Sequence, residues 1–366
     1  MPDATDCSDG YVPPPRTGPD PFESVDANVE AKLPEGSEVV SITPYGSNFW
    51  TQTARLETRL RDGMPKNYFL KVAEDENGMS MMRGEFESMS LLYSLTPDFV
   101  PKPHAWGSYQ GLTQFHFFLC DFHEMVEELP DIQAFTSSVA KLHNASLPIS
   151  PGRYGFHVPT HMGFMAQDNS WCDTWEEFFR QGMVRMLALE EAVHGPDPEL
   201  DTLVTKLYDK VIPRLLRPLT VLNSITPVLI HGDLWYGNCC TDTATGKPIV
   251  FDACAFWAHH EYEIGTWRAL RYRFGKPYRE AYFEHLPSSE PTEDQDDRDA
   301  LYSIRYDLHS SIAYSSSLRF RRDAMKTMEQ LIKKYPNGYD GWEAEYAISR
   351  KGEINDRTTT ERESKI

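Results

Sequence analysis

The segment Leu229–Cys240 reads LIHGDLWYGNCC. A short apolar run leads into His-Gly-Asp, and Asn238 follows Asp233 by five positions. Glycine and aspartate are common turn residues, but a turn does not need that asparagine. Beyond it, the residues TDTATGK form a turn signal between two short β runs, and the second run, PIVFD, ends at Asp252. The pattern predicts a polar loop followed by a β-hairpin that ends in a second aspartate.

These side chains suit phosphoryl transfer from ATP. Such a reaction depends mainly on positioning and charge neutralisation, so its site needs a divalent metal, oxygen ligands for that metal, and a base that orients the acceptor. We predict Asp233 as the base and Asn238 and Asp252 as ligands of Mg²⁺. Asp-x-x-x-x-Asn alone also arises by chance, and a lone His-Gly-Asp is often only a turn. The interpretation therefore depends on what the rest of the chain supplies.

Upstream, the chain offers an ion pair of the kind that holds phosphates. The run YFLKVA places Lys71 inside a β pattern, where an unpaired buried ammonium would be unfavourable. On the following helix, Glu85 shares its spacing with Met89 and Leu92, which predicts an inward-facing carboxylate. The alternative is that Glu85 is a solvated helix residue. We predict that Lys71 and Glu85 pair and bind the nucleotide.

The order of patterns predicts an α+β protein with two lobes. Residues 23–122 read as a small β-rich N-terminal lobe with one helix, and residues 123–345 as a larger lobe of long amphipathic helices that carries the polar loop and its hairpin. Residues 1–22 are acidic and rich in Pro, which predicts a flexible extension. Residues 346–366 read as a polar tail.

The composition of this 366-residue chain argues against some classes of binding partner. The formal net charge of −19 argues against nonspecific binding to nucleic acid or to anionic lipid. No run approaches the roughly 18 apolar residues expected of a membrane span, and the first residues do not resemble a secretory signal. Six cysteines without a CxxC pair do not suggest a disulfide framework. We expect a cytoplasmic protein of unknown oligomeric state.

Several of these segments together carry a resemblance. The stretches HGDLWYGN, PIVFDACAFWAHHEYEIG, FLKV, VPKPHAWG and WEEFFRQGM resemble the fructosamine/ketosamine kinase family over about residues 33–331. That family is related to aminoglycoside and choline phosphotransferases, and the resemblance implies a protein-kinase-like fold. It further implies phosphorylation of the sugar of ketosamines on small amines or protein lysines, with ATP and Mg²⁺ as cofactors.

The resemblance also assigns roles to further residues. Asp121, Phe122 and His123 resemble the hinge that binds adenine through its backbone, and Trp235 and His259 resemble residues that line the acceptor pocket. An indole face could cover a sugar ring, and an imidazole could bond its hydroxyls. Plain core packing is the alternative for Trp235. A zinc site at His259 and His260 is not expected, because no third ligand recurs at a plausible spacing.

Two departures from the family pattern concern the nucleotide and the metal. The turn expected to cover the phosphates, TPYGSNFWTQT, is not glycine-rich, although Gly46, Ser47 and Asn48 can still turn tightly and offer backbone N–H groups. Where the family often has Asp-Pro-Ala, this chain has Asp-Ala-Cys from Asp252 to Cys254. The metal ligand is kept, while the turn can differ.

Other functions remain open at this point. One is a related kinase acting on an amino sugar or on a choline-like amine. Another, from a different class, is a pseudokinase that serves as a nucleotide-binding module. The presence of every predicted catalytic side chain favours an enzyme.

Overall fold

The computed structural model describes residues 19–46, 50–126 and 128–348. Residues 1–18 of the predicted extension and 349–366 of the predicted tail lie outside this part. Packing divides the chain into two compact units, one of residues 1–185 and 226–288 and the other of residues 186–225 and 289–366. The first unit contains all the predicted site residues.

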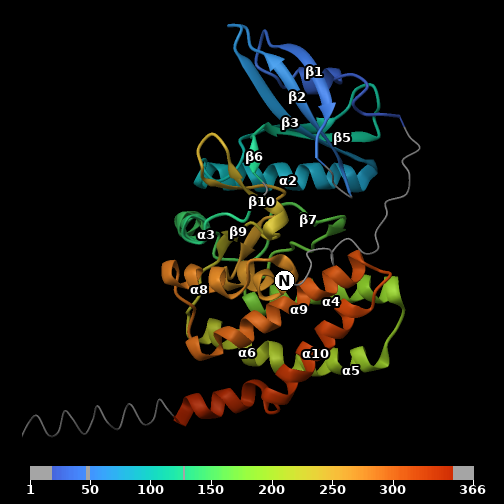
Figure 1. Ribbon diagram of the computed structural model, residues 1–366. Coiled ribbons are helices and arrows are strands. Elements are labelled where there is room, and N and C mark those ends of the chain that lie inside the picture. Colours follow the sequence, from blue (N-terminus) through green and yellow to red (C-terminus); the bar gives the residue numbers. More distant parts are fainter. Residues whose placement is uncertain (1–18, 47–49, 127, 349–366) are drawn as a thin grey trace, which may run out of the picture. The chain divides into compact units, whose positions relative to one another are not determined.

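The N-terminal part of the first unit is a five-stranded antiparallel sheet with one long helix, α2, between its third and fourth strands in the chain (Figure 1). The strands lie in the order β1-β2-β3-β5-β4, and α2 packs against β3, β4 and β5. The elements are α1 Ala27–Glu30, β1 Glu38–Pro44, β2 Gln52–Arg59, β3 Pro65–Glu74, α2 Asp75–Leu95, β4 Pro103–Ser108 and β5 Phe115–Asp121.

The two faces of this sheet differ because successive side chains of a strand point to opposite sides. On β3, Leu70 and Val72 belong to an apolar cluster that also contains Val29 of α1. Lys71 lies between them and points to the other face, toward α2. Its neighbour across the ladder, Phe118, meets Phe86 of α2 at 6.5 Å between ring centroids. The alternation of side chains along β3 therefore directs the Lys71 ammonium toward α2.

The packed lobe begins earlier in the chain than residue 23. Phe22 is buried in the same apolar cluster, and the hydroxyl of Tyr109 donates to the carbonyl of Pro21 at 3.2 Å. These two residues of the predicted extension therefore belong to the folded lobe.

The rest of the first unit consists of helices and short strands that frame the polar loop. Its elements are β6 Met125–Val126, α3 Ile132–Ser146, η2 Leu147–Ile149, β7 His161–Met162, β8 Met165–Ala166, β9 Val228–Ile230, η4 Tyr236–Asn238, β10 Cys239–Asp242, β11 Pro248–Val250, β12 Phe256–Ala258, α7 His260–Glu263, η5 Ile264–Arg268, η6 Leu270–Tyr272 and α8 Gly275–His285. The helix α4, Trp175–His194, begins in this unit and ends in the second.

The second unit is helical in its described part. Its elements are α5 Pro198–Lys206, η3 Leu207–Val211, α6 Ile212–Val221, η7 Thr292–Asp294, α9 Gln295–Ala313 and α10 Arg319–Lys334. Between α5 and α6, η3 forms a widened, π-type turn. Pro213, the second residue of α6, lacks a backbone N–H, so the regular α-helical hydrogen bonding cannot continue through it. Together with the sheet lobe, these helices confirm the predicted α+β class.

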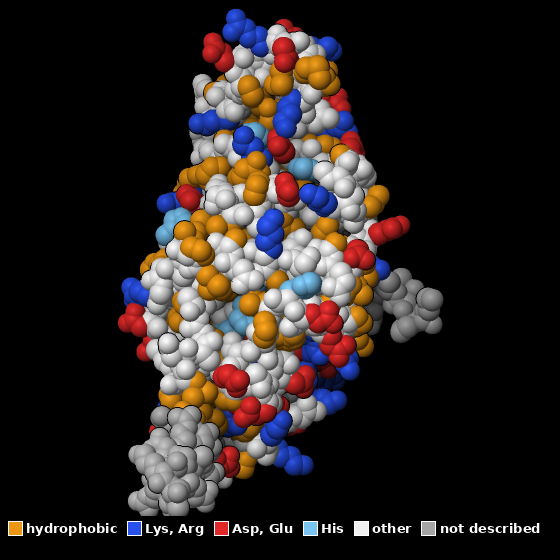
Figure 2. All heavy atoms as spheres, turned by 90° about the vertical axis from the view of Figure 1, so that its left-hand side faces the viewer, with side chains coloured by type: hydrophobic (Ala, Val, Ile, Leu, Met, Phe, Trp, Pro, Cys, Tyr) orange, Lys and Arg blue, Asp and Glu red, His pale blue; other side chains and the backbone are white. Residues whose placement is uncertain are grey.

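Charged side chains of both signs are interspersed over the described surface drawn in Figure 2. Among the described residues, no helix combines the length and the apolar character that crossing a membrane requires.

Candidate active site

Two strand pairs bring the predicted loops side by side. β9 pairs with β12, and β10 pairs with β11, both antiparallel. The loop from His231 to Asn238 runs between β9 and β10, and the loop from Phe251 to Ala255 runs between β11 and β12. The backbone N–H of Phe251 donates to the carbonyl of Asn238 at 3.1 Å, and that of Cys254 to the carbonyl of His231 at 3.0 Å. The two aspartates therefore lie on adjoining loops.

Gly232 is required by this close approach. Its φ is +88°, and a Cβ there would lie 2.4 Å from the carbonyl oxygen of Cys254. His231 is fully buried and its Nε2 meets the carbonyl oxygen of Phe251 at 2.9 Å. His231 and Gly232 of the motif thus connect the two loops. Asp233 is the residue of the motif that remains available for catalysis.

Asn238 orients Asp233. Its Nδ2 donates to the backbone carbonyl of Asp233 at 2.9 Å and to Oδ2 of the same residue at 3.0 Å. Asp233 is half-buried, while Asn238 is buried. Because both amide hydrogens of Asn238 are committed to Asp233, its Oδ1 is the atom that remains for a metal.

Lys71, Glu85 and Asp252 form one cluster. Lys71 Nζ donates to the two Glu85 oxygens at 2.7 and 2.9 Å and also contacts Asp252 Oδ1. Burial disfavours charge on Lys71, but the two carboxylates together outweigh it and raise its pKa above the ordinary value. Burial raises the pKa of Glu85 to about 7, with Lys71 opposing and Asp252 adding to the rise. The structure brings the predicted ion pair together.

The donor set fits a hard divalent cation. One ammonium faces two carboxylates, so the cluster carries more negative charge than Lys71 neutralises. Asp252 offers a second carboxylate oxygen beside the one that contacts Lys71, and Asn238 offers its Oδ1; both are oxygen atoms of the kind that Mg²⁺ prefers. Mg²⁺ is usually held by one or two carboxylates together with substrate phosphates. The residues present therefore fit the predicted metal.

Glu263 at the end of α7 is a site residue that the sequence analysis missed. Its carboxylate is fully buried and accepts the backbone N–H groups of His231 and Gly232, the latter at 3.1 Å. On the next segment, Thr266 Oγ1 and Trp267 Nε1 donate to the carbonyl of Leu234 at 3.1 and 2.8 Å. These bonds hold the loop on both sides of Asp233. Charge-assisted bonds of this kind are stronger than neutral ones.

A buried polar chain stands behind Glu263. His143 Nε2 of α3 lies 3.7 Å from its Oε2, and His143 Nδ1 is 2.8 Å from the hydroxyl of Tyr282. The same hydroxyl is 3.0 Å from Nδ1 of His260. A tyrosine hydroxyl donates once, so one of the two imidazoles must donate to it. Burial raises the pKa of Tyr282 well above its ordinary value, which keeps this donor protonated.

Glu263→Gln should separate positioning from chemistry. The amide keeps one acceptor oxygen but turns an NH₂ group toward a buried backbone N–H, which leaves a buried donor unsatisfied. We expect the free energy of unfolding to fall by about 2 kcal/mol and kcat to fall with little change in the KM for ATP. Denaturant unfolding and steady-state kinetics measure both. Glu177→Gln on the surface of α4 is the matched control, and unchanged kcat in Glu263→Gln would exclude the positioning role.

The predicted nucleotide residues are only partly described. Gly46 has a φ of +76° and begins the turn between β1 and β2, while Ser47 and Asn48 lie outside the described residues. Asp121 ends β5, and its Oδ1 accepts bonds from His104 Nε2 at 2.7 Å and from Lys66 Nζ at 2.6 Å. Burial would raise the pKa of the Asp121 carboxyl, but the bonds from His104 and Lys66 outweigh this effect and lower the pKa to about 2.

The other two hinge residues follow where the chain leaves the sheet. The ring of Phe122 meets Tyr45 at 4.9 Å between centroids, beside the turn that begins at Gly46. His123 Nδ1 is 2.7 Å from Oδ2 of Asp242. Burial would raise the pKa of the Asp242 carboxyl, but the hydrogen bonds from His123 and Thr245 outweigh this effect and lower the pKa. The backbone N–H groups of Asp121 and Phe122 already donate to the carbonyls of Lys102 and Asn67, at 2.9 and 3.3 Å, so the contact of this segment with adenine stays a prediction.

Beyond the phosphate turn, Trp50 packs on the β7–β8 hairpin. Its ring centroid lies 4.6 Å from that of Phe164, and a Cβ on Gly163 would come within 2.9 Å of the indole Nε1. The hairpin in turn accepts a hydrogen bond at the Phe164 carbonyl from Asn77 of α2, at 3.3 Å. Trp50 is therefore anchored to the β7–β8 hairpin.

The two predicted acceptor residues lie in different environments. Trp235 is half-buried, and its indole lies against its own loop, because a Cβ on Gly237 would be 2.5 Å from the ring. His259 is fully buried and packs edge-on against Trp175 at 6.3 Å. An enclosed imidazole cannot bond an acceptor hydroxyl unless its neighbours move. Only Trp235 is therefore carried into the proposed acceptor site.

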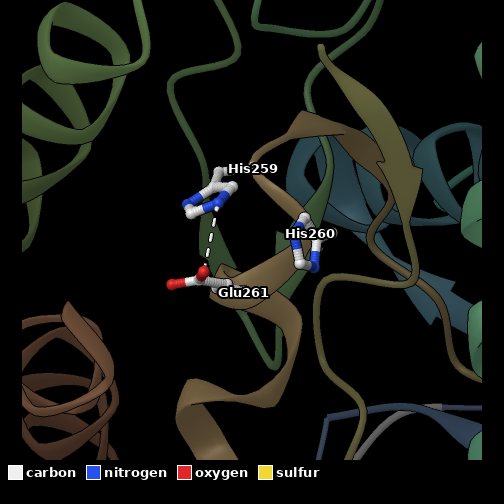
Figure 3. A group of neighbouring side chains, drawn as sticks. All are labelled: His259, His260 and Glu261. Atoms are coloured by element: carbon white, nitrogen blue, oxygen red, sulfur yellow. Dashed lines mark ion pairs between the residues drawn. The ribbon is translucent and has the colours of Figure 1, made fainter. Parts of the chain in front are cut away.

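His259 also belongs to a cluster that could hold a metal ion. Ligand atoms of His259, His260 and Glu261 lie within 4.8 Å of one another, so Glu261 supplies the third ligand that the spacing did not suggest. Figure 3 shows His259 beside the Glu261 carboxylate, 3.8 Å away, with the His260 ring to one side. His260 Nδ1 already meets the Tyr282 hydroxyl. The metal assignment stays with Asn238 and Asp252.

A lysine of a small antiparallel sheet pairs with a glutamate of the helix packed against it, and two adjoining loops carry an Asp/Asn pair and a second Asp. These features define an ATP-dependent phosphotransferase of the protein-kinase-like fold. Comparison with known families then places the chain among them. Residues 47–334 match the fructosamine kinase model, and the chain belongs to this family.

Individual relatives agree with this assignment. The chain is 29% identical over 262 residues to the chloroplastic protein-ribulosamine 3-kinase of Oryza sativa subsp. japonica, which covers 69% of this chain and 71% of the relative. It is 32% identical over 182 residues to ketosamine-3-kinase of Mus musculus, covering 50% and 54% of the two chains.

Solved structures share the fold at lower identity. A protein assigned as a fructosamine-3-kinase from Thermobifida fusca superposes with a TM-score of 0.65 at 21% identity, covering 85% of this chain and 99% of the other. Aminoglycoside phosphotransferase APH(4)-Ia, in a ternary complex with AMP-PNP and hygromycin B, gives a TM-score of 0.52 at 15% identity, covering 85% and 98%. The predicted protein-kinase-like fold is confirmed.

Proposed function

We propose that this protein transfers the γ-phosphoryl group of ATP to a sugar hydroxyl of ketosamines. The observation that carries the proposal is the Asp233–Asn238 pair on a loop adjoining Asp252, Lys71 and Glu85, in a chain of the fructosamine kinase family. The names of the relatives, which act on ribulosamines or ketosamines, support the acceptor class.

The geometry supports a division of labour. Asp233 accepts the proton of the attacking hydroxyl, and Asn238 keeps its carboxylate oriented. Lys71, held by Glu85, binds the α/β-phosphates. Asn238 Oδ1 and the Asp252 carboxylate would hold Mg²⁺, which when bound neutralises charge on the phosphates. Trp50, which packs on Phe164, helps to exclude water.

Further parts of the proposal concern partners and location. The acceptor is a free ketosamine or one on the lysine of a glycated protein, and the location is the cytoplasm. The five described cysteines are all free thiols, which supports a reducing compartment.

An acceptor screen tests the proposal. Purified protein with magnesium and ATP is offered deoxyfructosyl- and ribulosyl-amines, the parent amines without sugar, amino sugars, and choline-like amino alcohols. We expect phosphate on the ketosamine sugar, with its position read by NMR, and no reaction of the parent amines. If amino alcohols or amino sugars react faster than every ketosamine, the acceptor class is wrong. Nucleotide binding without turnover of any acceptor would indicate a pseudokinase.

Trp235→Ala should affect the acceptor and spare the nucleotide. The indole is half-buried and follows Asp233 by two residues, so its exposed part can cover a sugar ring. We expect kcat/KM for a ketosamine to fall about tenfold, near 1.4 kcal/mol, with the KM for ATP almost unchanged. Trp235→Phe keeps an aromatic face and should recover part of the loss. An unchanged acceptor kcat/KM in the alanine variant would remove Trp235 from the pocket.

A further inference from the structure

The segment from Arg268 to Arg273 reads RALRYR and is unusual in this chain. It places three arginines within six residues of a protein whose formal net charge is −19. Leu270 is 87% exposed, so the segment reaches the surface of its unit. It follows directly on η5, whose Thr266 and Trp267 hold the carbonyl of Leu234. The arginines are therefore introduced close to the catalytic loop.

Arg273 is held over an aromatic ring of that loop. Its Cζ lies 4.8 Å from the ring centroid of Tyr236, and its backbone N–H donates to the carbonyl of Leu270 at 3.0 Å. Its φ of +65° is a backbone conformation that residues other than glycine, asparagine and aspartate seldom adopt. Since Arg273 is exposed and still keeps this backbone conformation, the fold determines where its side chain points.

The guanidinium lacks the partner that arginine usually has in an acidic protein. Along the described chain, no carboxylate pairs with Arg273, and its only recorded side-chain contact is Tyr236. A guanidinium that lies over a ring and has no paired carboxylate keeps N–H donors available, and their fork matches the two oxygens of a carboxylate. Arg273 thus presents a pre-oriented fork of donors to solvent.

The position of this fork relates it to the acceptor. The ring of Tyr236 meets that of Trp235 at 4.8 Å, so two successive contacts of 4.8 Å connect the guanidinium to the indole proposed to cover the sugar. Trp235 and Tyr236 both belong to the loop that carries Asp233. A group attached to the sugar through the ketosamine nitrogen would extend from the indole, and the ring sequence leads from there to Arg273.

We propose that Arg273 forms an anion subsite that binds a carboxylate carried by the amine component of the acceptor. The inference rests on the proposed function and narrows its substrate class to ketosamines of amino acids with a free carboxylate. Tyr236 positions the guanidinium, and Arg273 supplies two N–H donors to the carboxylate. Ketosamines of neutral amines would reach Asp233 without this contact and react less efficiently.

A matched pair of acceptors tests the subsite. Deoxyfructosyl-glycine and deoxyfructosyl-glycinamide differ in the carboxylate and little else. We expect the wild-type protein to favour the acid by about fivefold in kcat/KM, in keeping with a partly exposed ion pair. In Arg273→Gln the ratio of acid to amide should fall to about one, and Arg273→Lys should keep part of it. Arg61→Gln, at an exposed arginine in the turn between β2 and β3, is the control and should leave the ratio unchanged.

Salt and the control reactions separate the possible outcomes. The preference for the acid should shrink as sodium chloride is raised, because an exposed ion pair is screened. Equal kcat/KM for acid and amide in the wild-type protein, with both phosphorylated, would refute the subsite and leave the kinase function intact. Failure of both compounds to react would refute the ketosamine assignment and the subsite with it.

Discussion

Asp233→Asn is expected to lower kcat for phosphoryl transfer about a thousandfold, the scale of lost general base catalysis. The carboxylate is the group proposed to take the proton of the attacking hydroxyl, and an amide cannot do so. The loop should keep its shape, because the new side chain still offers an oxygen to Nδ2 of Asn238. ATP affinity should change by no more than about twofold, since the base is not needed to hold the nucleotide.

Single-turnover kinetics and calorimetry with magnesium–ATP measure these two quantities separately. Asp98→Asn is a matched control, since this exposed aspartate makes only a 3.4 Å contact with Lys247. If Asp233→Asn keeps turnover within a few-fold of the wild-type value, another group accepts the proton and the role of Asp233 is wrong.

Asp252→Ala is expected to weaken magnesium–ATP binding by about a hundredfold or more. It removes the carboxylate proposed to hold the metal and one of the two acidic partners of Lys71. The fold should tolerate the change, because Glu85 still receives Lys71 Nζ through both of its oxygens. The ammonium is then paired and remains buried at little cost.

Calorimetry of the Asp252→Ala variant should be run with ATP both with and without magnesium. We expect the loss to be confined largely to the experiment with magnesium, while the thermal midpoint of the ligand-free protein changes little. Unchanged magnesium–ATP affinity would remove Asp252 from the metal site. A large fall in the thermal midpoint with normal affinity would show that the residue is structural.

Much of the site could be predicted because its residues lie in local patterns. Strand alternation placed Lys71 among apolar neighbours, and helical spacing turned Glu85 inward; the structure brings the two to 2.7 Å. The long helix α3, Ile132–Ser146, agrees with the amphipathic helices predicted for the larger lobe, and the side chain of Asp131 caps its start. In these cases the local pattern and the tertiary packing favour the same structure.

Other residues could not be predicted because their roles depend on distant partners. Glu263 reads in the sequence EYEIG as one more acid of a short helix, and only the fold brings its carboxylate to backbone groups 31 and 32 residues away. His259 reads as a polar residue near the metal loop, whereas packing against Trp175 encloses it completely. Neighbours in sequence do not determine whether a histidine faces substrate or core.

The contact of Trp50 with Phe164 and Gly163 has a consequence for the lifetime of bound nucleotide. If Trp50 moves when ADP is released, its indole must leave the hairpin and its apolar face must become hydrated. Hydration of apolar surface raises the heat capacity. The rate of ADP release should therefore show a curved temperature dependence. At low temperature, product release, more than phosphoryl transfer, would then limit the turnover rate.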